Sequence, residues 1–553
     1  MSNVKGKSDI PPTESKTTRM AGNSPHGSQE IPATSASPME ADRSVQANSR
    51  TTDMHAAGKS DSSIVPMKPA NNGGPLPPAE SAEGRGLTKE NIDQSLLDRT
   101  QSRHADGHPS QPRSRGLAGV RVAARDDKKR KFTCLLHHLT PELLQASFFA
   151  LKKQAAPGID GATWQDYAKD FERRIVDLHG RIHRGAYRAK PSKRTYIPKT
   201  DGKMRPLGIA ALEDKIVQQA VRTVLECIYE QDFQGFSYGF RPGRSQHMAL
   251  DALYVGIAHR KVNWVIDADI RGFFDNISHE WLMKFLEHRI ADRRMLRLLK
   301  KWLRAGVSED GKWSPTKVGT PQGAVISPLL ANVFLHYVLD LWIDEWRKRQ
   351  AKGEVIIVRY ADDFVIGFRE GSDARRCLAA LKDRFAKFGL ELHPEKTRLI
   401  EFGRFAQSNR ARRNERPPET FDFLGFTHIC GKSWRGDFAI HRQTSRKKLQ
   451  AKLAEIKEEL KRRMHHHPSE VGAWLRRVVT GWFRYYAVPG NSKRLQQFRY
   501  ALCRLWLRTL RRRSQRGRGL TWARFNRHFQ GWLPTPTILH PYPEQRFARR
   551  HPR

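Results

Sequence analysis

The chain has 553 residues and a formal net charge of +42, from 99 Lys and Arg against 57 Asp and Glu. That length favours more than one domain, and that charge favours a polyanionic partner such as nucleic acid. The five cysteines form no Cys-x-x-Cys pair, which argues against a disulfide framework or a thiolate zinc site. No apolar run could cross a bilayer and no signal-peptide core opens the chain, so we expect a soluble, intracellular protein without a membrane partner.

Residues 1–125 are dominated by Ser, Pro, Gly, Thr, Asn and charged residues, with few aromatics. Such a segment cannot bury enough apolar surface to offset its ordering entropy, so we expect a disordered tail with a short helix near residues 90–97. A solvated tail is the simpler interpretation, and RNA tethering is the alternative. Order is expected near Lys131, followed by helices over about 141–153 and 164–181.

A basic hairpin is predicted over residues 193–209, where two strand-like runs flank an Asp-Gly turn. Basic side chains at both ends could hold a triphosphate from two sides, although an ordinary basic hairpin explains them equally well. A helix is expected over 212–229. The Gly- and Arg-rich loop with aromatics at 236–245 suits contact with nucleic acid.

Two apolar strands carry acidic residues. In the strand 263–270, Asp267 and Asp269 share one face because side chains alternate with a period of two. Residues 355–368 form two arms rich in Val, Ile and Phe that meet at a turn bearing Asp362 and Asp363. Adjacent carboxylates repel each other unless they share a cation, and their hard oxygens suit Mg²⁺. A solvated turn is the alternative, and periodicity does not choose between Asp267 and Asp269.

Helices are expected over 279–305, from the Thr-Pro-Gln-Gly loop at 320–323 to about 346, and over 372–388, with a strand and loop at 389–397. Residues 421–426 read as another short hairpin arm. From 432 to 553 the chain has 30 Lys and Arg against 6 Asp and Glu. Apolar residues recur there at helical spacing with Trp and Tyr between basic runs, which predicts an RNA-binding helical domain rather than a merely solvated charged face.

Seven motifs then occur in one order, and together they resemble the group II intron-encoded reverse transcriptase/maturases over about residues 130–543. They are Arg205-Pro206-Leu207-Gly208-Ile209, Gly239-Phe240-Arg241-Pro242-Gly243-Arg244-Ser245, Asp269-Ile270-Arg271-Gly272-Phe273-Phe274-Asp275, Thr320-Pro321-Gln322-Gly323, Tyr360-Ala361-Asp362-Asp363, Lys396-Thr397 and Phe423-Leu424-Gly425-Phe426.

The resemblance implies an α+β fold: a right-hand polymerase with antiparallel sheet in its fingers and palm, then an all-α basic thumb/maturase domain. We expect a disordered tail at 1–125, fingers at 126–235, palm at 236–430 and the thumb/maturase domain at 431–543. The family register also selects Asp269 over Asp267. Asp269 and Asp362, with Asp363 beside them and the carbonyl of Ile270, are then expected to hold two Mg²⁺ ions.

The resemblance assigns the remaining site residues as well. Lys199 and Arg205 match the fingers residues that meet the incoming dNTP, and Phe274 matches the bulky steric gate against a 2′-hydroxyl. Gln322 matches the glutamine of the nucleotide pocket. Lys396 matches a lysine proposed as general acid toward the pyrophosphate.

The function implied is RNA-directed DNA synthesis together with binding of the host group II intron RNA, to promote splicing and retrohoming. The expected partners are that intron RNA, an RNA template and a DNA primer or target. Many relatives carry a C-terminal His-Asn-His nuclease with cysteine pairs, which this sequence lacks, so we expect no bottom-strand cleavage. The alternatives are a catalytically silent RNA-binding splicing factor and a reverse transcriptase of another bacterial retroelement or defence system.

The charge of the C-terminal region predicts a steep salt dependence of RNA binding. Each phosphate neutralised by Lys or Arg releases counterions, so contact with about six to ten phosphates should weaken binding roughly 10³–10⁵-fold between 50 and 200 mM salt. Filter binding of a structured RNA across that salt range measures the slope. A flat dependence would contradict the electrostatic interpretation.

Overall fold

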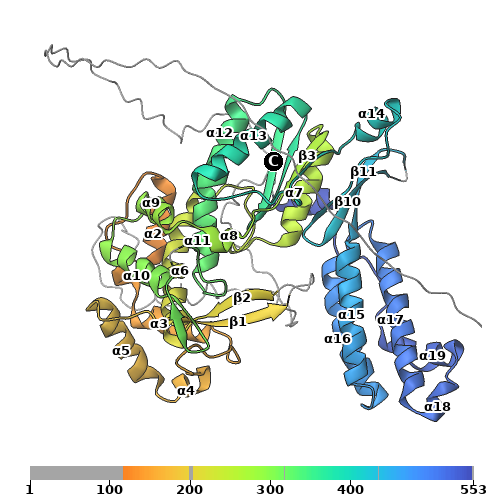
Figure 1. The fold of residues 1–553 in the computed structure, drawn as a ribbon, viewed down its shortest axis with the longest axis horizontal. Helices are drawn as coiled ribbons and strands as arrows, with labels where there is room; N and C mark the ends of the chain where they lie inside the picture. Colours follow the sequence, from red (N-terminus) through yellow and green to blue (C-terminus); the bar gives the residue numbers. More distant parts are fainter. Residues whose placement is uncertain (1–115, 199–203, 317, 434, 551–553) are drawn as a thin grey trace, which may run out of the picture. The chain divides into compact units, whose positions relative to one another are not determined.

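The computed structural model describes residues 116–198, 204–316, 318–433 and 435–550 (Figure 1). The expected tail lies almost entirely outside these residues, as does the short helix near 90–97. None of the described helices is long and apolar enough to cross a membrane.

Helix α2 (Leu117–Asp126) falls inside the range assigned to the tail, so the predicted start of order near Lys131 is wrong. Its residues Val120 and Ala124 are buried in the same apolar cluster as α6 (Leu212–Asp232), which gives this short helix the tertiary packing it needs. The predicted helix over 141–153 ends earlier, and the one over 164–181 is divided at Asp170. The bounds are η2 (Leu136–His138), α3 (Pro141–Phe149), α4 (Trp164–Ala168) and α5 (Phe171–His183).

The predicted basic hairpin is present as β1 (Ser192–Pro198) and β2 (Met204–Ile209), with Lys193 opposite Ile209. The Asp-Gly turn between them lies outside the described residues. Strand β1 also pairs in parallel with β4 (Val307–Glu309), which pairs with β5 (Lys312–Ser314). The sheet order is β2-β1-β4-β5, and the β4–β5 ribbon was not predicted from the sequence.

The helices between the sheets match most of the predicted ranges. The long apolar helix after the 320–323 loop is interrupted, because residues His336–Asp340 form a π-helical turn, η3, between α11 (Ser327–Leu335) and α12 (Leu341–Arg349). The others are α7 (Gln246–His259), α8 (Phe273–Asn276), α9 (His279–Glu287), α10 (Arg293–Arg304), α13 (Gly371–Lys387) and α14 (Ala406–Arg412).

A second sheet has the order β6-β7-β3-β8 and carries both acidic segments. Its strands are β6 (Val355–Tyr360), β7 (Asp363–Phe368), β3 (Trp264–Ala268) and β8 (Arg398–Glu401). The alternation predicted for residues 263–270 is confirmed, because Ile266, Ala268 and Ile270 enter one apolar cluster while Val265 enters the other. Both faces are therefore covered, which explains the near-continuous apolar arms. The strand predicted at 389–397 forms instead at β8.

The C-terminal part begins with strands, so the expectation that residues 431–543 are all-α is wrong at its start. Strand β10 (Phe426–Lys432) pairs with β9 (Phe421–Phe423) and with β11 (Phe438–Thr444). The predicted basic helices follow, and Ile456, Leu460, Leu495, Phe498 and Leu502 are buried as their spacing indicated. Their bounds are α15 (Arg446–Arg462), α16 (Pro468–Tyr486), α17 (Ser492–Arg513), α18 (Gln515–Arg518), α19 (Trp522–His528), η4 (Gln530–Trp532) and α20 (Pro543–Arg550).

One buried carboxylate joins the C-terminal part to the preceding one. Asp251 on α7 accepts from Arg442 Nη1 of β11 at 2.9 Å and from Arg546 Nη2 of α20 at 3.1 Å. The side chains of Asp251 and Arg442 are 2% and 1% exposed. Three elements far apart in sequence therefore depend on one acceptor that water does not reach.

Replacing Asp251 should destabilise the fold strongly. Asp251→Ala would leave the buried Arg442 guanidinium uncompensated, and removal of one partner of a buried pair typically costs about 3–5 kcal/mol. Urea unfolding measures this loss. Glu280→Ala, which removes a solvent-exposed partner of Lys284 on α9, is the control and should leave the urea midpoint unchanged. Equal midpoints for the two variants would contradict the role assigned to Asp251.

Candidate active site

The pairing of two strands brings the separate acidic segments together. Strand β3 runs antiparallel to β7 with Ala268 opposite Phe364. Continued by one residue, this register sets Asp269 opposite Asp363, the first residue of β7. The predicted convergence of these two segments is thus present in the backbone, with Asp362 beside Asp363 in the turn.

The turn bearing the aspartates is tight. Tyr360 pairs with Asp363 across the hairpin, and Ala361 has a φ of +59°, in the left-handed region that residues with a Cβ rarely occupy. Gly239 lies directly against this turn, because a Cβ added there would stand 2.2 Å from the Ala361 nitrogen. The Gly-rich loop predicted as a nucleic-acid contact therefore also packs against the aspartate turn.

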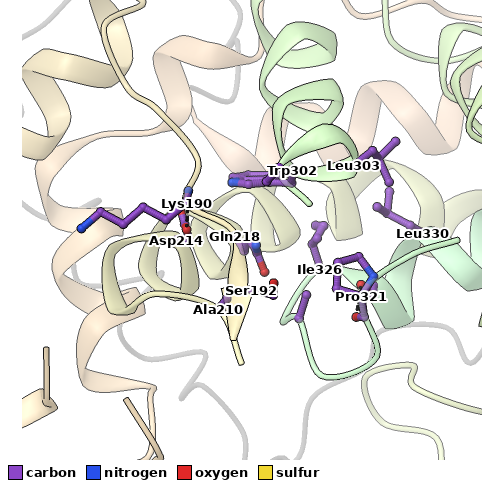
Figure 2. Close-up of a pocket in the computed structure, with 13 residues that line it drawn as sticks. Lys190, Ser192, Ala210, Asp214, Gln218, Trp302, Leu303, Pro321, Ile326 and Leu330 are labelled. Atoms are coloured by element: carbon purple, nitrogen blue, oxygen red, sulfur yellow. Dashed lines mark hydrogen bonds between the residues drawn. The ribbon is translucent and has the colours of Figure 1, made fainter. Parts of the chain in front are cut away.

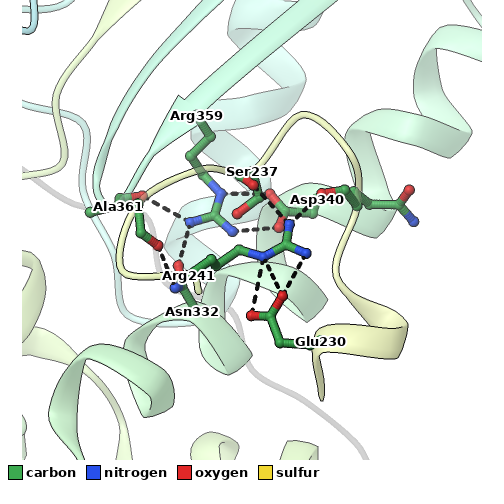
Figure 3. Close-up of polar contacts among 9 residues, drawn as sticks. Glu230, Ser237, Arg241, Asn332, Asp340, Arg359 and Ala361 are labelled. Carbon is green, nitrogen blue, oxygen red and sulfur yellow. Dashed lines mark hydrogen bonds and ion pairs between the residues drawn. The ribbon is translucent and has the colours of Figure 1, made fainter. Parts of the chain in front are cut away.

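A buried polar network holds the turn in this conformation (Figure 3). Arg359 is completely buried and forms an ion pair with Asp340, which is equally buried. Its Nη1 donates to Asn332 Oδ1 at 3.0 Å and to the Ala361 carbonyl at 2.9 Å. Asn332 in turn donates to the Gly239 carbonyl at 2.7 Å. One guanidinium thus connects the turn to α11 and to the π-helical turn η3.

A second arginine braces the neighbouring loop (Figure 3). Arg241 donates to the Ser237 carbonyl at 2.7 Å and pairs with Glu230 of α6 at 3.0 Å. The Tyr238 nitrogen donates to the Arg359 carbonyl at 2.9 Å. The loop 236–241 is therefore connected to β6 through its backbone and to α6 through a side chain.

The clustered carboxylates disfavour one another's charged forms. Desolvation raises the pKa of Asp363 to about 7, and repulsion from Asp362 and Asp269 adds to the shift, while Lys396 opposes it. The pKa of Asp362 is raised by desolvation and then by Asp269. Because the Asp363 side chain remains exposed by surface area, water offsets part of its desolvation. Repulsion is the contribution that a bound cation relieves.

Two cationic side chains already contact the acids of this strand. Lys396 Nζ lies 2.5 Å from Asp269 Oδ2, and Arg398 Nη2 lies 3.2 Å from Asp267 Oδ2. The pKa of Asp267 is raised to about 6, chiefly by desolvation. Asp267 and Asp269 therefore differ in their partners, because the first pairs with an arginine of the adjacent strand and the second with a lysine beyond the sheet.

Within the described ranges, no three His, Cys, Asp or Glu side chains lie close enough together to form a ready-made metal site. The chemistry of the donors nevertheless fits Mg²⁺, since Asp269, Asp362 and Asp363 offer only carboxylate oxygens and repel one another. Their assignment as metal ligands, and that of the Ile270 carbonyl, stays a prediction.

Three side chains of other predicted motifs meet near the hairpin β1–β2. Arg205 Nε donates to Gln322 Oε1 at 3.1 Å, and Gln322 Nε2 donates to both carboxylate oxygens of Asp275 at 3.2 Å each. Thr320 N donates to the carbonyl of Phe274, the predicted steric gate, at 2.8 Å. Lys199 lies outside the described residues. Arg205, Gln322 and Phe274 thus lie in one region, and the roles that the resemblance implied for them stay predictions.

A small cavity of about 10 Å³ is lined in part by Pro321, the neighbour of Gln322, and by Asp214 and Gln218 (Figure 2). Asp214 accepts from Lys190 N at 3.0 Å, and Gln218 Oε1 accepts from Val325 N at 2.9 Å. The space is far too small for a nucleotide. These two hydrogen bonds attach the segment before β1 and the end of the 320–326 loop to helix α6.

The residues that support the site were not predicted from the sequence. Arg359, Asp340 and Asn332 were not singled out, and neither was the side chain of Asp275. A sequence pattern could have indicated them. Arg359 is a charged residue inside an apolar strand and Asp340 an acid inside an apolar helix, and such residues are usually buried only as pairs. The pairing itself could not be read without the tertiary structure.

Residues 197–428 match the family model described as reverse transcriptase (RNA-dependent DNA polymerase). Protein YkfC of Escherichia coli is 36% identical over 275 residues, which cover 44% of this chain and 72% of that protein. The group II intron-encoded protein LtrA of Lactococcus lactis subsp. cremoris is 38% identical over 219 residues, or 38% of this chain and 36% of that protein.

A putative COX1/OXI3 intron 1 protein of Saccharomyces cerevisiae is 27% identical over 397 residues, which cover 58% of this chain and 46% of that protein. The chain therefore spans less than half the length of LtrA and of the COX1/OXI3 intron 1 protein. The matched family range includes β2, the β6–β7 turn and Lys396, the elements on which the candidate site depends.

The raised pKa of Asp363 predicts a pH-dependent stability without divalent cations. Because its folded-state pKa of about 7 exceeds the usual 3.8, its contribution is fully present below about 3.8 and is lost as the pH rises through 7. Urea unfolding at pH 5 and pH 8 should therefore show a smaller decline with pH for Asp363→Asn than for the wild type. Asp383→Asn, at an exposed position of α13, is the control and should follow the wild type.

Addition of Mg²⁺ gives the complementary measurement. A cation relieves carboxylate repulsion only when the carboxylates are ionised, so it should stabilise the wild type more at pH 8 than at pH 5. Stabilisation that is equal at both pH values, or unaffected by Asp363→Asn, would contradict the electrostatic interpretation of the turn.

Proposed function

Because the chain belongs to the reverse transcriptase family, in the group of the group II intron-encoded reverse transcriptase/maturases, we propose that it extends DNA on an RNA template by two-metal-ion nucleotidyl transfer. This membership confirms the family resemblance that was drawn from the motifs. RNA-directed DNA polymerase activity is the function of that family. Members of the family use Mg²⁺ and deoxynucleoside triphosphates.

The observation that carries the proposal is the strand pairing at the acidic turn. The register of β3 with β7, continued by one residue, sets Asp269 opposite Asp363. Mutual repulsion among carboxylates that the fold holds together is costly unless a cation compensates it. A buried arginine that fixes the turn supports the same conclusion, since polymerisation needs carboxylates at defined positions.

Asp269, Asp362 and Asp363, with the Ile270 carbonyl, would hold the two Mg²⁺ ions. When bound, these ions supply activation of the primer 3′-hydroxyl and compensation of the charge on the triphosphate and leaving pyrophosphate. The protein itself orients the reactants. In this proposal Arg205 and Lys199 bind the triphosphate of the incoming dNTP.

The remaining residues select the nucleotide and assist the leaving group. Phe274 would exclude a ribose 2′-hydroxyl by bulk, and Gln322 would contact the incoming nucleotide from the 320–323 loop. Lys396 would donate a proton to the pyrophosphate. Its Nζ, 2.5 Å from Asp269 Oδ2, is already beside the carboxylates.

We propose a right-hand arrangement for the chain, with fingers at 126–235, palm at 236–430 and thumb/maturase domain at 431–543. The β6-β7-β3-β8 sheet with the acidic turn supports the palm. The hydrogen bond of Arg205 to Gln322 supports a fingers hairpin that closes on the nucleotide site. The antiparallel sheets agree with the α+β class predicted.

The C-terminal helices supply the proposed RNA-binding surface. Helix α17 carries Arg511, Arg512 and Arg513 in its last turn, and no acidic residue in its first. Family membership implies nucleic-acid partners. We propose that these are the host group II intron RNA, whose splicing and retrohoming the protein promotes, the RNA template and a DNA primer or target, in the cytoplasm.

A catalytically silent splicing factor is the second candidate. It would bind RNA through the same basic helices, whose last turn in α17 carries Arg511, Arg512 and Arg513, and would not synthesise DNA. A reverse transcriptase of another bacterial retroelement or defence system would share the same polymerase site and lack the intron partner. A primer-extension assay distinguishes the silent splicing factor, which would not synthesise DNA, from the proposed polymerase. Binding of intron RNA distinguishes the proposed protein from a reverse transcriptase of another element, which would lack that partner.

Loss of a single carboxylate should separate synthesis from RNA binding. Asp362→Ala should reduce primer extension on an RNA template with Mg²⁺ by about a thousandfold or more, since metal charge stabilisation contributes several kcal/mol to the transition state. RNA affinity in filter binding should stay near the wild-type value. Asp267→Asn is the matched control. Asp267 lies on the same strand face as Asp269 but pairs with Arg398, so this variant should retain extension. Undiminished extension by Asp362→Ala would refute the metal assignment.

A further inference from the structure

Three side chains from three separate elements form a chain of hydrogen bonds that ends on Asp275. Arg205 comes from β2, Gln322 from the loop before α11, and Asp275 from α8. We propose that Asp275 is a positioning residue of the nucleotide pocket, which fixes the Gln322 amide and through it aims the Arg205 guanidinium. This inference rests on the proposed function and adds a residue to it.

The donor and acceptor pattern allows only one orientation of the amide. An ionised carboxylate only accepts, so Asp275 selects the NH₂ group of Gln322, which lies 3.2 Å from both of its oxygens. The Gln322 carbonyl oxygen is thereby turned toward Arg205 Nε, which only donates. If the amide were flipped, its carbonyl oxygen would face the Asp275 carboxylate, and its NH₂ group would face the Arg205 Nε–H.

This chain of contacts aims Arg205 without neutralising it. The bond to Gln322 uses Nε, which leaves the two terminal nitrogens of the guanidinium for a bidentate contact with phosphate. Among the residues that the structure describes, no carboxylate forms an ion pair with Arg205. Because a neutral amide stands between Asp275 and Arg205, orientation is transmitted while the full positive charge stays available to a triphosphate.

The backbone around Gln322 is held by contacts that do not involve the Asp275 side chain. Gly208 N donates to the Gln322 carbonyl at 2.7 Å, and Gly319 N donates to the Ile277 carbonyl at 2.8 Å. Gly319 has a φ of +90°, and a Cβ there would stand 2.8 Å from the Asp275 carbonyl. The Asp275 side chain is exposed, so its replacement should reorient the amide without unfolding the loop.

The test is a double-mutant cycle on single-nucleotide extension of a DNA primer on an RNA template. Asp275→Ala should raise KM for the dNTP about tenfold with kcat little changed, which is the size of one lost hydrogen bond to a charged group. Asp275→Asn, which keeps one acceptor, should raise KM less. In a Gln322→Ala background, Asp275→Ala should add less than about twofold, because it acts only through the amide.

Matched controls exclude a general structural effect. The thermal midpoint of Asp275→Ala should equal that of the wild type, and Glu280→Ala, an exposed carboxylate of the following helix, should leave KM unchanged. Additive losses in the double variant, or a fall in kcat with unchanged KM, would overturn the proposal.

Equilibrium binding of dTTP with Mg²⁺, measured by isothermal titration, distinguishes failure of the inference from failure of the proposed function. If the wild type binds dTTP but does not extend primers, the polymerase assignment fails, and the same cycle on binding still tests Asp275. If Asp275→Ala binds dTTP as the wild type does, or if the wild type does not bind it, the positioning role is refuted.

Discussion

The buried guanidinium of Arg359 is the contact on which the candidate site depends. Burying a charge costs several kcal/mol unless it is fully paired, and here Asp340, Asn332 and the Ala361 carbonyl provide the acceptors. Because a partly satisfied network would be costly, the turn has little freedom to take another conformation. The same contacts support the left-handed conformation of Ala361, which by itself is unfavourable by about 1–2 kcal/mol.

A fixed turn presents carboxylates that repel one another. Desolvation and then this repulsion raise the pKa of Asp363 to about 7, while Lys396, which contacts Asp269, opposes the shift. Lys396 thus acts as an internal counter-ion for a carboxylate that the proposed chemistry assigns to a metal. If Asp269 binds a metal ion as proposed, that ion would compete with Lys396 for the same carboxylate oxygens.

The C-terminal region is tied to the polymerase part by burial as well as by charge. One apolar cluster contains Val265 of β3, Leu253 of α7 and Phe498 of α17, so the sheet bearing Asp269 shares a core with the basic helices. Asp251 adds a polar connection through Arg442 and Arg546. The proposed RNA-binding surface on these helices therefore lies on elements that share an apolar core with the sheet that carries the carboxylates.

The sequence by itself determined the acidic strand and turn, the basic hairpin, most helices and the family, because these depend on local periodicity, turn chemistry and motif order. The family resemblance, and not periodicity, selected Asp269 over Asp267 and implied the roles of Arg205, Gln322 and Phe274 in one nucleotide pocket. Only the tertiary structure decided which polar groups support them. The side-chain partners of Arg359 and Asp251 lie 19 to 295 residues away, and no local pattern encodes such pairings. Helix α2 and the π-helical turn η3 were missed for the same reason, since packing against distant residues, not local propensity, stabilises them.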